Sequence, residues 1–141
     1  MTAAMTTPCV GIITPPFTIV QVDIVLDADW RDPLPTIVEA DGVPLDLTDY
    51  ELQWYVRPTY DYDGEFIMLS TVAVGGDGPY IVIDDAAEGL ASMDVPRADL
   101  QGMFVAGDWQ HFLVLKDASS QYWELARGPF RVHPGLTTAF P

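Results

Sequence analysis

The stretch Tyr50-Glu-Leu-Gln-Trp-Tyr-Val-Arg57 decides the fold class of this chain. Apolar and polar side chains alternate along it, with Tyr50, Leu52, Trp54 and Val56 on one face. A period of two residues is typical of a β-strand that lays one face on a core. Pro58 follows directly and is expected to end the strand. The stretch therefore predicts a half-buried strand, with Trp54 and Tyr50 packed into the core.

Shorter runs of the same kind lie on both sides of this strand. They predict strands at 17–26, 36–39, 65–74, 80–84, 90–95, 111–116, 122–127 and 130–133. Gly128-Pro129 is expected to separate the last two strands. One short helix is predicted at 96–102, with Pro96 near its start and Gly102 at its end. Many short strands with turn signals every 8–12 residues are typical of a β-sandwich or a small barrel.

The chain divides into three parts by composition. Residues 1–16 are rich in Thr, Ala and Pro and carry no charge, which predicts an extended N-terminal arm. Residues 17–133 hold all the predicted strands and form one β domain. Residues 134–141 are expected to be a C-terminal tail. The arm lacks the basic region and the long apolar run of a signal peptide, and no run of the chain reaches the length of a membrane span.

The charge of the chain is strongly negative and unevenly distributed. The 141 residues carry 21 Asp and Glu against 6 Lys and Arg, a formal net charge of −15. Residues 1–22 have no charged side chain, 23–94 hold the whole acidic excess, and 97–141 are balanced. We expect no nucleic-acid partner, because phosphate binding needs a basic surface. Sixteen of the acids are Asp, which favours turns, so most of the charge is expected at solvated turns between strands.

No residue pattern predicts an enzyme or a cofactor. Nucleophilic catalysis needs a Cys or Ser beside a His base, but Cys9 lies in the arm and His111 is expected to be an ordinary strand residue. His133 is expected to be the same. Asp61 and Asp63 could contact a cation, but Gly64-Glu65 breaks the spacing of a calcium loop, so a solvated turn is expected. We therefore expect a non-enzymatic protein without metal or cofactor.

Contact residues are expected in the arms and in loop aromatics. An uncharged apolar segment such as 10–13 is costly in water and could lie along a neighbour as an added strand. Loop aromatics are better candidates for contact than strand aromatics such as Trp109 and Trp123, which are expected in the core. The predicted interface residues are Val10, Ile12, Ile13, Phe17, Trp30, Tyr60, Tyr62 and Phe140.

Three segments together resemble a known family. Glu39-Ala-Asp-Gly-Val-Pro-Leu-Asp-Leu-Thr-Asp-Tyr50, leading to Arg57, resembles the D-G-x-P-x-D-L-T-G-Y…R segment of immunoglobulin-like modules in tailed-bacteriophage structural proteins. The N-terminal domain of phage baseplate upper proteins is the best-known relative. Ala106-Gly-Asp-Trp109 and Gly128-Pro-Phe-Arg-Val132 match later features of these modules, so the resemblance covers residues 17–133. Asp49 departs from the pattern, where Gly is commoner, and no receptor-binding extension follows.

The resemblance implies an all-β fold: one immunoglobulin-like β-sandwich of about eight antiparallel strands, with one short helix and extended arms. It implies a virion structural protein, made in the host cytoplasm, in the baseplate, a tail adaptor or the head decoration. Its partners would be other virion proteins and further copies of itself, with no membrane and no nucleic acid. Two alternatives remain: a small acidic inhibitor or DNA mimic, and a carbohydrate-binding β-sandwich whose loop aromatics line one groove.

Overall fold

A computed structural model describes residues 12–13, 18–39, 41–59, 66–73 and 78–135 of the chain. Among these residues the strands are β1 (Ile12–Ile13), β2 (Thr18–Ile19), β3 (Val22–Val25), β4 (Thr36–Ile37), β5 (Glu51–Pro58), β6 (Ile67–Ser70), β7 (Ile81–Asp85), β8 (Leu90–Met93), β9 (Gly107–Lys116) and β10 (Tyr122–His133). The helices are a 3-10 turn at Ala86–Glu88 and α1 (Arg97–Met103). None of the described helices is long and apolar enough to cross a membrane.

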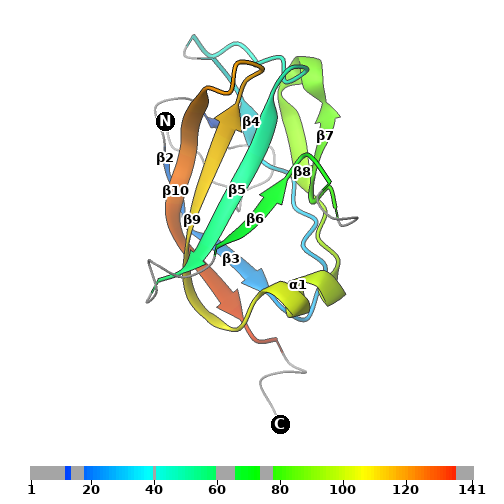
Figure 1. Cartoon of the computed structure of the whole chain (residues 1–141), viewed down its shortest axis with the longest axis vertical. Coiled ribbons are helices and arrows are strands. Elements are labelled where there is room, and N and C mark those ends of the chain that lie inside the picture. Colours follow the sequence, from blue (N-terminus) through cyan, green and yellow to red (C-terminus); the bar gives the residue numbers. More distant parts are fainter. Residues whose placement is uncertain (1–11, 14–17, 40, 60–65, 74–77, 136–141) are drawn as a thin grey trace.

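The larger layer is a six-stranded sheet in the order β2-β10-β9-β5-β6, with β3 following β2 along the same edge of β10. Figure 1 shows β10, β9 and β5 side by side across the front of the molecule, with α1 below them. The pairs β10–β9, β9–β5 and β5–β6 are antiparallel. The predicted strand at 50–57 is thus confirmed, and it lies near the middle of the sheet as β5.

The smaller layer is built on the antiparallel pair β7–β8. The segment before β4 runs along β8 through bridges between Trp30 and Val95 and between Pro33 and Ser92. The Ile37 amide then donates to the Gly89 carbonyl at 3.0 Å, which brings β4 into the same layer. Ile12–Ile13 pairs with β4 in parallel. Ile12 and Ile13, the described part of the segment 10–13 that we expected to lie along a neighbouring protein, therefore pair with a strand of their own chain.

This topology is immunoglobulin-like. The order β10-β9-β5-β6 reproduces the G-F-C-C′ sheet of variable-type domains, and β4, β8 and β7 reproduce the B-E-D sheet. Trp54 on β5 occupies the place of the buried tryptophan of strand C. The prediction of an all-β, immunoglobulin-like sandwich with one short helix is confirmed. The expected antiparallel pairing is wrong at the N-terminal strands, since β2 and β3 both run parallel to β10.

An aromatic cluster joins the two layers where antibody domains carry a disulfide. The chain has one cysteine and so cannot form that bridge internally. The Trp54 ring instead lies 5.1 Å from Trp30, 5.4 Å from His111 and 6.4 Å from Phe130, measured between centroids. Trp30 belongs to the smaller layer and the other three to the larger one. Burial of these rings supplies the area-dependent stabilisation that small sandwiches need.

β10 is one continuous strand, which corrects the expected break at Gly128-Pro129. In the parallel pairing with the N-terminal segment, the Val20 amide donates to the Arg127 carbonyl at 2.8 Å. The amide that would reach the Val20 carbonyl next is that of residue 129, and proline has no N–H. That carbonyl lies 2.7 Å from Nε2 of the His111 ring instead. A side chain thus completes the pairing that the proline interrupts, and the ladder resumes at β3.

The connection between β4 and β5 explains the aspartate-rich signature at 41–50. Asp41 Oδ1 accepts the Val43 amide and Asp46 Oδ1 accepts the Thr48 amide, each at 3.0 Å. Such contacts two residues along the chain hold tight Asx turns. The hydroxyl of Thr48 also donates to Asp46 and lowers the pKa of that carboxyl. Leu47, the middle residue of the second turn, is fully buried. The signature is therefore turn chemistry that leads the chain into β5.

Candidate functional site

The side of the six-stranded sheet that faces away from the core is the strongest candidate for a functional surface. We call it the outer face, and it comprises the side chains that alternate with the buried ones along β5, β6, β9 and β10. Its members are Glu51, Tyr55, Arg57, Met68, Asp108, Gln110, Phe112, Val114, Lys116, Tyr122, Glu124, Arg127, Pro129 and Arg131. A β-bulge between Glu124 and Ala126 keeps Arg127 on this face.

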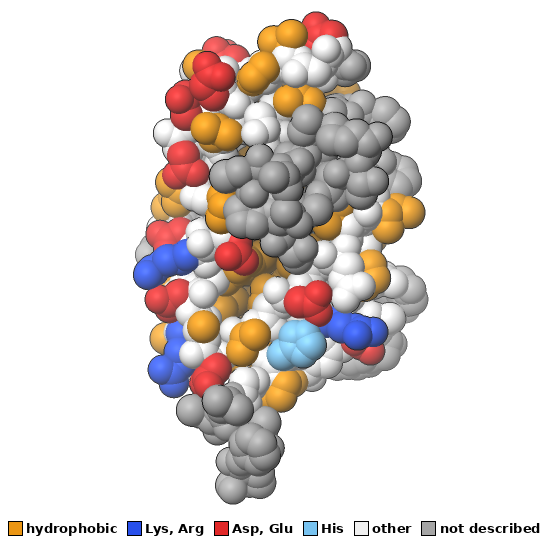
Figure 2. Space-filling view, turned by 180° about the vertical axis from the view of Figure 1, so that it is seen from behind, with side chains coloured by type: hydrophobic (Ala, Val, Ile, Leu, Met, Phe, Trp, Pro, Cys, Tyr) orange, Lys and Arg blue, Asp and Glu red, His pale blue; other side chains and the backbone are white. Residues whose placement is uncertain are grey.

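Four of the six cationic residues of the chain belong to the outer face. They are Arg57, Lys116, Arg127 and Arg131, and they share the face with three acids. The rest of the sequence holds eighteen acids against two cations, Arg31 and Arg97, a formal net charge of −16. Figure 2 shows the opposite side of the molecule, where acidic side chains run from the top down one margin. The outer face is therefore nearly neutral on a strongly acidic protein.

Three ion pairs on this face join neighbouring positions. Arg127 donates to both Glu124 oxygens, from Nε at 2.9 Å and from an Nη nitrogen at 2.7 Å. Arg131 lies 3.4 Å from Asp108, and Lys116 lies 3.6 Å from Glu51. The hydrogen bonds from Arg127 to Glu124 raise the pKa of that guanidinium. Exposed pairs of this kind contribute little stability, but they leave charges of both signs in fixed places.

An apolar row crosses the sheet between these charges. Met68, Tyr55 and Phe112 are directly opposite one another on β6, β5 and β9, and the Arg127 guanidinium lies 5.4 Å from the Phe112 centroid. The Phe66 ring, half exposed, extends the row 5.1 Å from Tyr55. Burial raises the pKa of Tyr55, whose hydroxyl donates to Gln53 Oε1 at 2.6 Å. A row of aromatic and aliphatic side chains on a solvent-facing sheet is typical of a contact surface.

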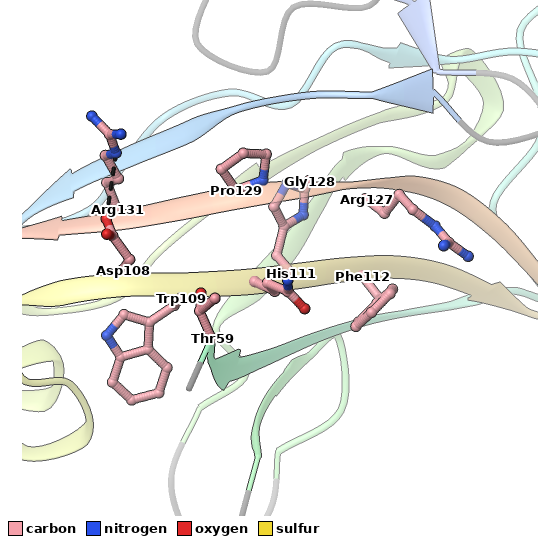
Figure 3. A pocket seen from close by; sticks show the side chains of 10 residues that line it. Thr59, Asp108, Trp109, His111, Phe112, Arg127, Gly128, Pro129 and Arg131 are labelled. Carbon is pink, nitrogen blue, oxygen red and sulfur yellow. Dashed lines mark ion pairs between the residues drawn. The ribbon is translucent and has the colours of Figure 1, made fainter. Parts of the chain in front are cut away.

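A hollow of about 440 Å³ lies over the paired strands β9 and β10 at one end of this face. Phe112 and Arg127 lie at one end of the hollow, and the Arg131–Asp108 ion pair lies at the other (Figure 3). Gln110 and Pro129 form part of the wall between them. The hollow thus offers an apolar wall, an amide and two guanidinium groups to a side chain of a partner.

The two histidines form no catalytic arrangement with the described residues around them. His111 is buried, and its Nδ1 accepts a hydrogen bond from Trp54 Nε1 at 2.9 Å. Its proton must therefore be on Nε2, which donates to the Val20 carbonyl. Burial lowers the pKa of His111 to about 4. His133 lies at the strand edge, 2.9 Å from Asp23 Oδ1.

The residues expected at an interface fall into three groups. Val10, Phe17, Tyr60, Tyr62 and Phe140 lie outside the described residues, as do Cys9, Asp61 and Asp63. Ile12 and Ile13 form β1. Trp30 is a correction, because it is only 6 % exposed and packs on Trp54 and Phe130. Its bridge to Val95 draws the predicted loop into the smaller layer, so Trp30 is a core residue and not a contact residue.

Two further sequence-based expectations concern tryptophans and metals. Trp109 is buried as expected, but Trp123, near the start of β10, is 36 % exposed. Within the described part of the chain, no three His, Cys, Asp or Glu residues gather closely enough to hold a metal ion.

Sequence reasoning missed the outer face as a site. A signal existed, because Arg57, Lys116, Arg127 and Arg131 all fall within predicted strands or at their ends, whereas most acids fall at turns. Which of these strands are neighbours is set by the sheet order, which the sequence does not state.

Comparison with known proteins adds little. No protein-family model matches the chain, and no curated protein matches it. Among solved structures, that of murine CRIg is similar over 80 % of this chain and 92 % of its own, with a TM-score of 0.38 and 9 % sequence identity. A likeness this weak carries no information about function.

Proposed function

We propose that this protein is a non-enzymatic structural component of a tailed-phage virion, acting by protein–protein assembly in the baseplate, a tail adaptor or the head decoration. The observation that carries the assembly role is the outer face. It combines an apolar row, three ion pairs and a hollow on one sheet surface. Protein interfaces are typically rich in aromatic residues, Met and Arg, and this face presents all three.

The phage assignment rests on the sequence resemblance at 39–57 and at 106–132. Within the first of these segments, Asp41 and Asp46 hold the two turns that lead into β5. Partners would be other virion proteins and further copies of this chain, assembled after synthesis in the host cytoplasm.

The test is whether the protein is part of a particle. Particles are purified on a density gradient from a lysate of the host that carries the gene, and their proteins are identified by mass spectrometry. We expect this chain at a copy number in whole-number proportion to the known head or tail proteins. Its absence from intact particles, while it is abundant in the soluble lysate, would overturn the proposal.

A second candidate function is an acidic inhibitor that imitates nucleic acid. The favouring observation is that four cations are concentrated on one face, which leaves the rest of the surface strongly acidic. Carboxylates arranged in this way attract a basic site on another protein. Tight, salt-sensitive binding to an immobilised basic nuclease by a monomeric chain would favour this function over the structural one.

A further inference from the structure

We infer that the outer face binds the outer face of a second copy of this chain, with the two six-stranded sheets packed against each other about a two-fold axis. The inference rests on the proposed assembly role and names the partner of its candidate surface. It is argued from the distribution of charge and apolar side chains among the described residues.

The first step is that a surface of strong net charge does not suit this face. A partner that turned an acid-rich surface towards the face would be repelled by a protein of net charge −15. A strongly basic partner would be attracted to the acid-rich surfaces outside the face, where two cations accompany fourteen of the 17 acids that the structure describes. The suitable occupant therefore presents a nearly neutral surface with apolar side chains of its own.

The second step is that a second outer face has these properties. An isologous contact brings the same patch of both copies together, so the patch must be complementary to itself. The apolar row of Met68, Tyr55 and Phe112 can pack on its counterpart near the axis. On both sides of the row lie pairs of opposite charge, Lys116 with Glu51 towards one end and Arg131 with Asp108 towards the other. Each end of the outer face in one copy can therefore meet charges of the opposite sign in the second copy.

The third step concerns the remaining charge. Packing the outer faces together directs the smaller, acid-rich layers of both copies away from each other. Acids of the smaller layer, such as Asp84, Asp85 and Glu88, then lie on the far sides of the pair, which lowers the Coulomb repulsion that opposes association.

The experiment measures the mass of the purified full-length chain by sedimentation equilibrium and by light scattering, in low and in high sodium chloride. We expect a monomer–dimer equilibrium that shifts towards dimer as salt increases, because salt screens the repulsion between two acidic bodies. A contact between an acidic surface and the cations of another copy would weaken with salt, and that result would overturn the inference.

Variants locate the interface. Phe112→Asp places a carboxylate at the centre of the row, and we expect at least about tenfold weaker dimerisation. Met68→Asp tests the same row from β6, in case the first variant does not fold. Val43→Asp is the matched control, since Val43 is 52 % exposed in the connection between β4 and β5 and lies outside the face. Circular dichroism checks that each variant is folded.

The outcomes separate the inference from the proposed function. A chain that stays monomeric at both salt concentrations, or a dimer that a folded Phe112→Asp variant leaves unchanged, overturns the inference. If that chain is nevertheless found in particles, the structural function still stands. A dimer that behaves as expected in a protein absent from particles supports the inference and overturns the virion assignment.

Discussion

His111 shows how one buried side chain links three strands of the larger sheet. It lies on β9, accepts from Trp54 on β5 and donates to the Val20 carbonyl between β2 and β3. It can do so only as the neutral tautomer with its proton on Nε2, because protonation would replace the acceptor with a second donor facing Trp54 Nε1. The three strands therefore depend on the charge state of one imidazole.

This dependence predicts acid sensitivity. The pKa of His111 is about 4 in the folded chain against 6.5 in the unfolded chain, so the unfolded state binds more protons between these values. The stabilising contribution is complete above pH 6.5 and is lost as the pH falls towards 4, by up to about 3 kcal/mol. Urea unfolding across this range should show a steeper loss for the wild type than for His111→Gln. Equal slopes would contradict the prediction, since the carboxylates are common to both proteins.

Gly128 is a second position at which the fold depends on one residue type, because a side chain there would clash with the neighbouring backbone. Its φ is +152°, and a Cβ atom there would lie 2.3 Å from the Val20 carbonyl oxygen. We expect Gly128→Ala to lower the free energy of unfolding by more than about 2 kcal/mol, because the N-terminal segment would be pushed off β10. Gly102→Ala is the control, since nothing lies within 4 Å of its Cβ position in α1. That change should stabilise by about 0.5 to 1 kcal/mol. Thermal denaturation of both variants distinguishes the two directions.

Among the elements, α1 obtains its N-terminal hydrogen bond from a distant loop. Pro96 precedes the helix and provides no side-chain cap, but Asp29 Oδ1 accepts the Arg97 amide at 2.7 Å. This contact joins α1 to the loop before β4 and complements the positive end of the helix.

Removing that contact should destabilise the chain. We expect Asp29→Ala to cost about 1 kcal/mol, as loss of an N-cap does, and Asp29→Asn to cost clearly less, because the amide oxygen still accepts. Urea unfolding at neutral pH measures both. The pair also tests the exposed Arg31–Asp29 ion pair, at 3.1 Å, which both variants remove. Equal losses in the two variants would assign the effect to the ion pair instead of the cap.

The elements show what the sequence could and could not predict. Alternation predicted β5 and the end of β9 well, since the apolar residues of each that face the core are buried, although Gln53 of β5 is buried as well. The predicted strand break at Gly128-Pro129 was wrong. Proline was expected to end the pairing, whereas the His111 side chain compensates for the missing N–H. The prediction that Trp30 is a contact residue was wrong, because a bridge to Val95, 65 positions later, decides its burial. The outer face depends on strand order for the same reason: its members come from four strands.

Folding brings the many negative charges of the whole molecule closer together. A net charge of −15 on a domain of this size raises the electrostatic free energy of the compact state relative to the expanded one. The cations on the outer face lower it locally, through pairs with Glu51, Glu124 and Asp108.

The melting temperature should therefore rise with sodium chloride at neutral pH. Screening weakens the repulsion among the 21 acids more than it weakens the few ion pairs. Differential scanning calorimetry over a salt series measures the shift, with Phe112→Asp as a control in which any dimer is weakened. A melting temperature that falls on addition of salt would show that the ion pairs outweigh the repulsion.

The parallel attachment of β2 and β3 to β10 has a consequence for biosynthesis. The first strands of the domain have no partner in the larger sheet until residues 122–133 have been made, because β10 alone holds them there. A ribosome must therefore deliver nearly the whole domain before its two ends can meet. Pairings so distant in sequence form slowly, and β2 and β3 remain exposed until β10 has been synthesised. Production of this protein should depend on the completeness of its C-terminal strand more than on any other segment.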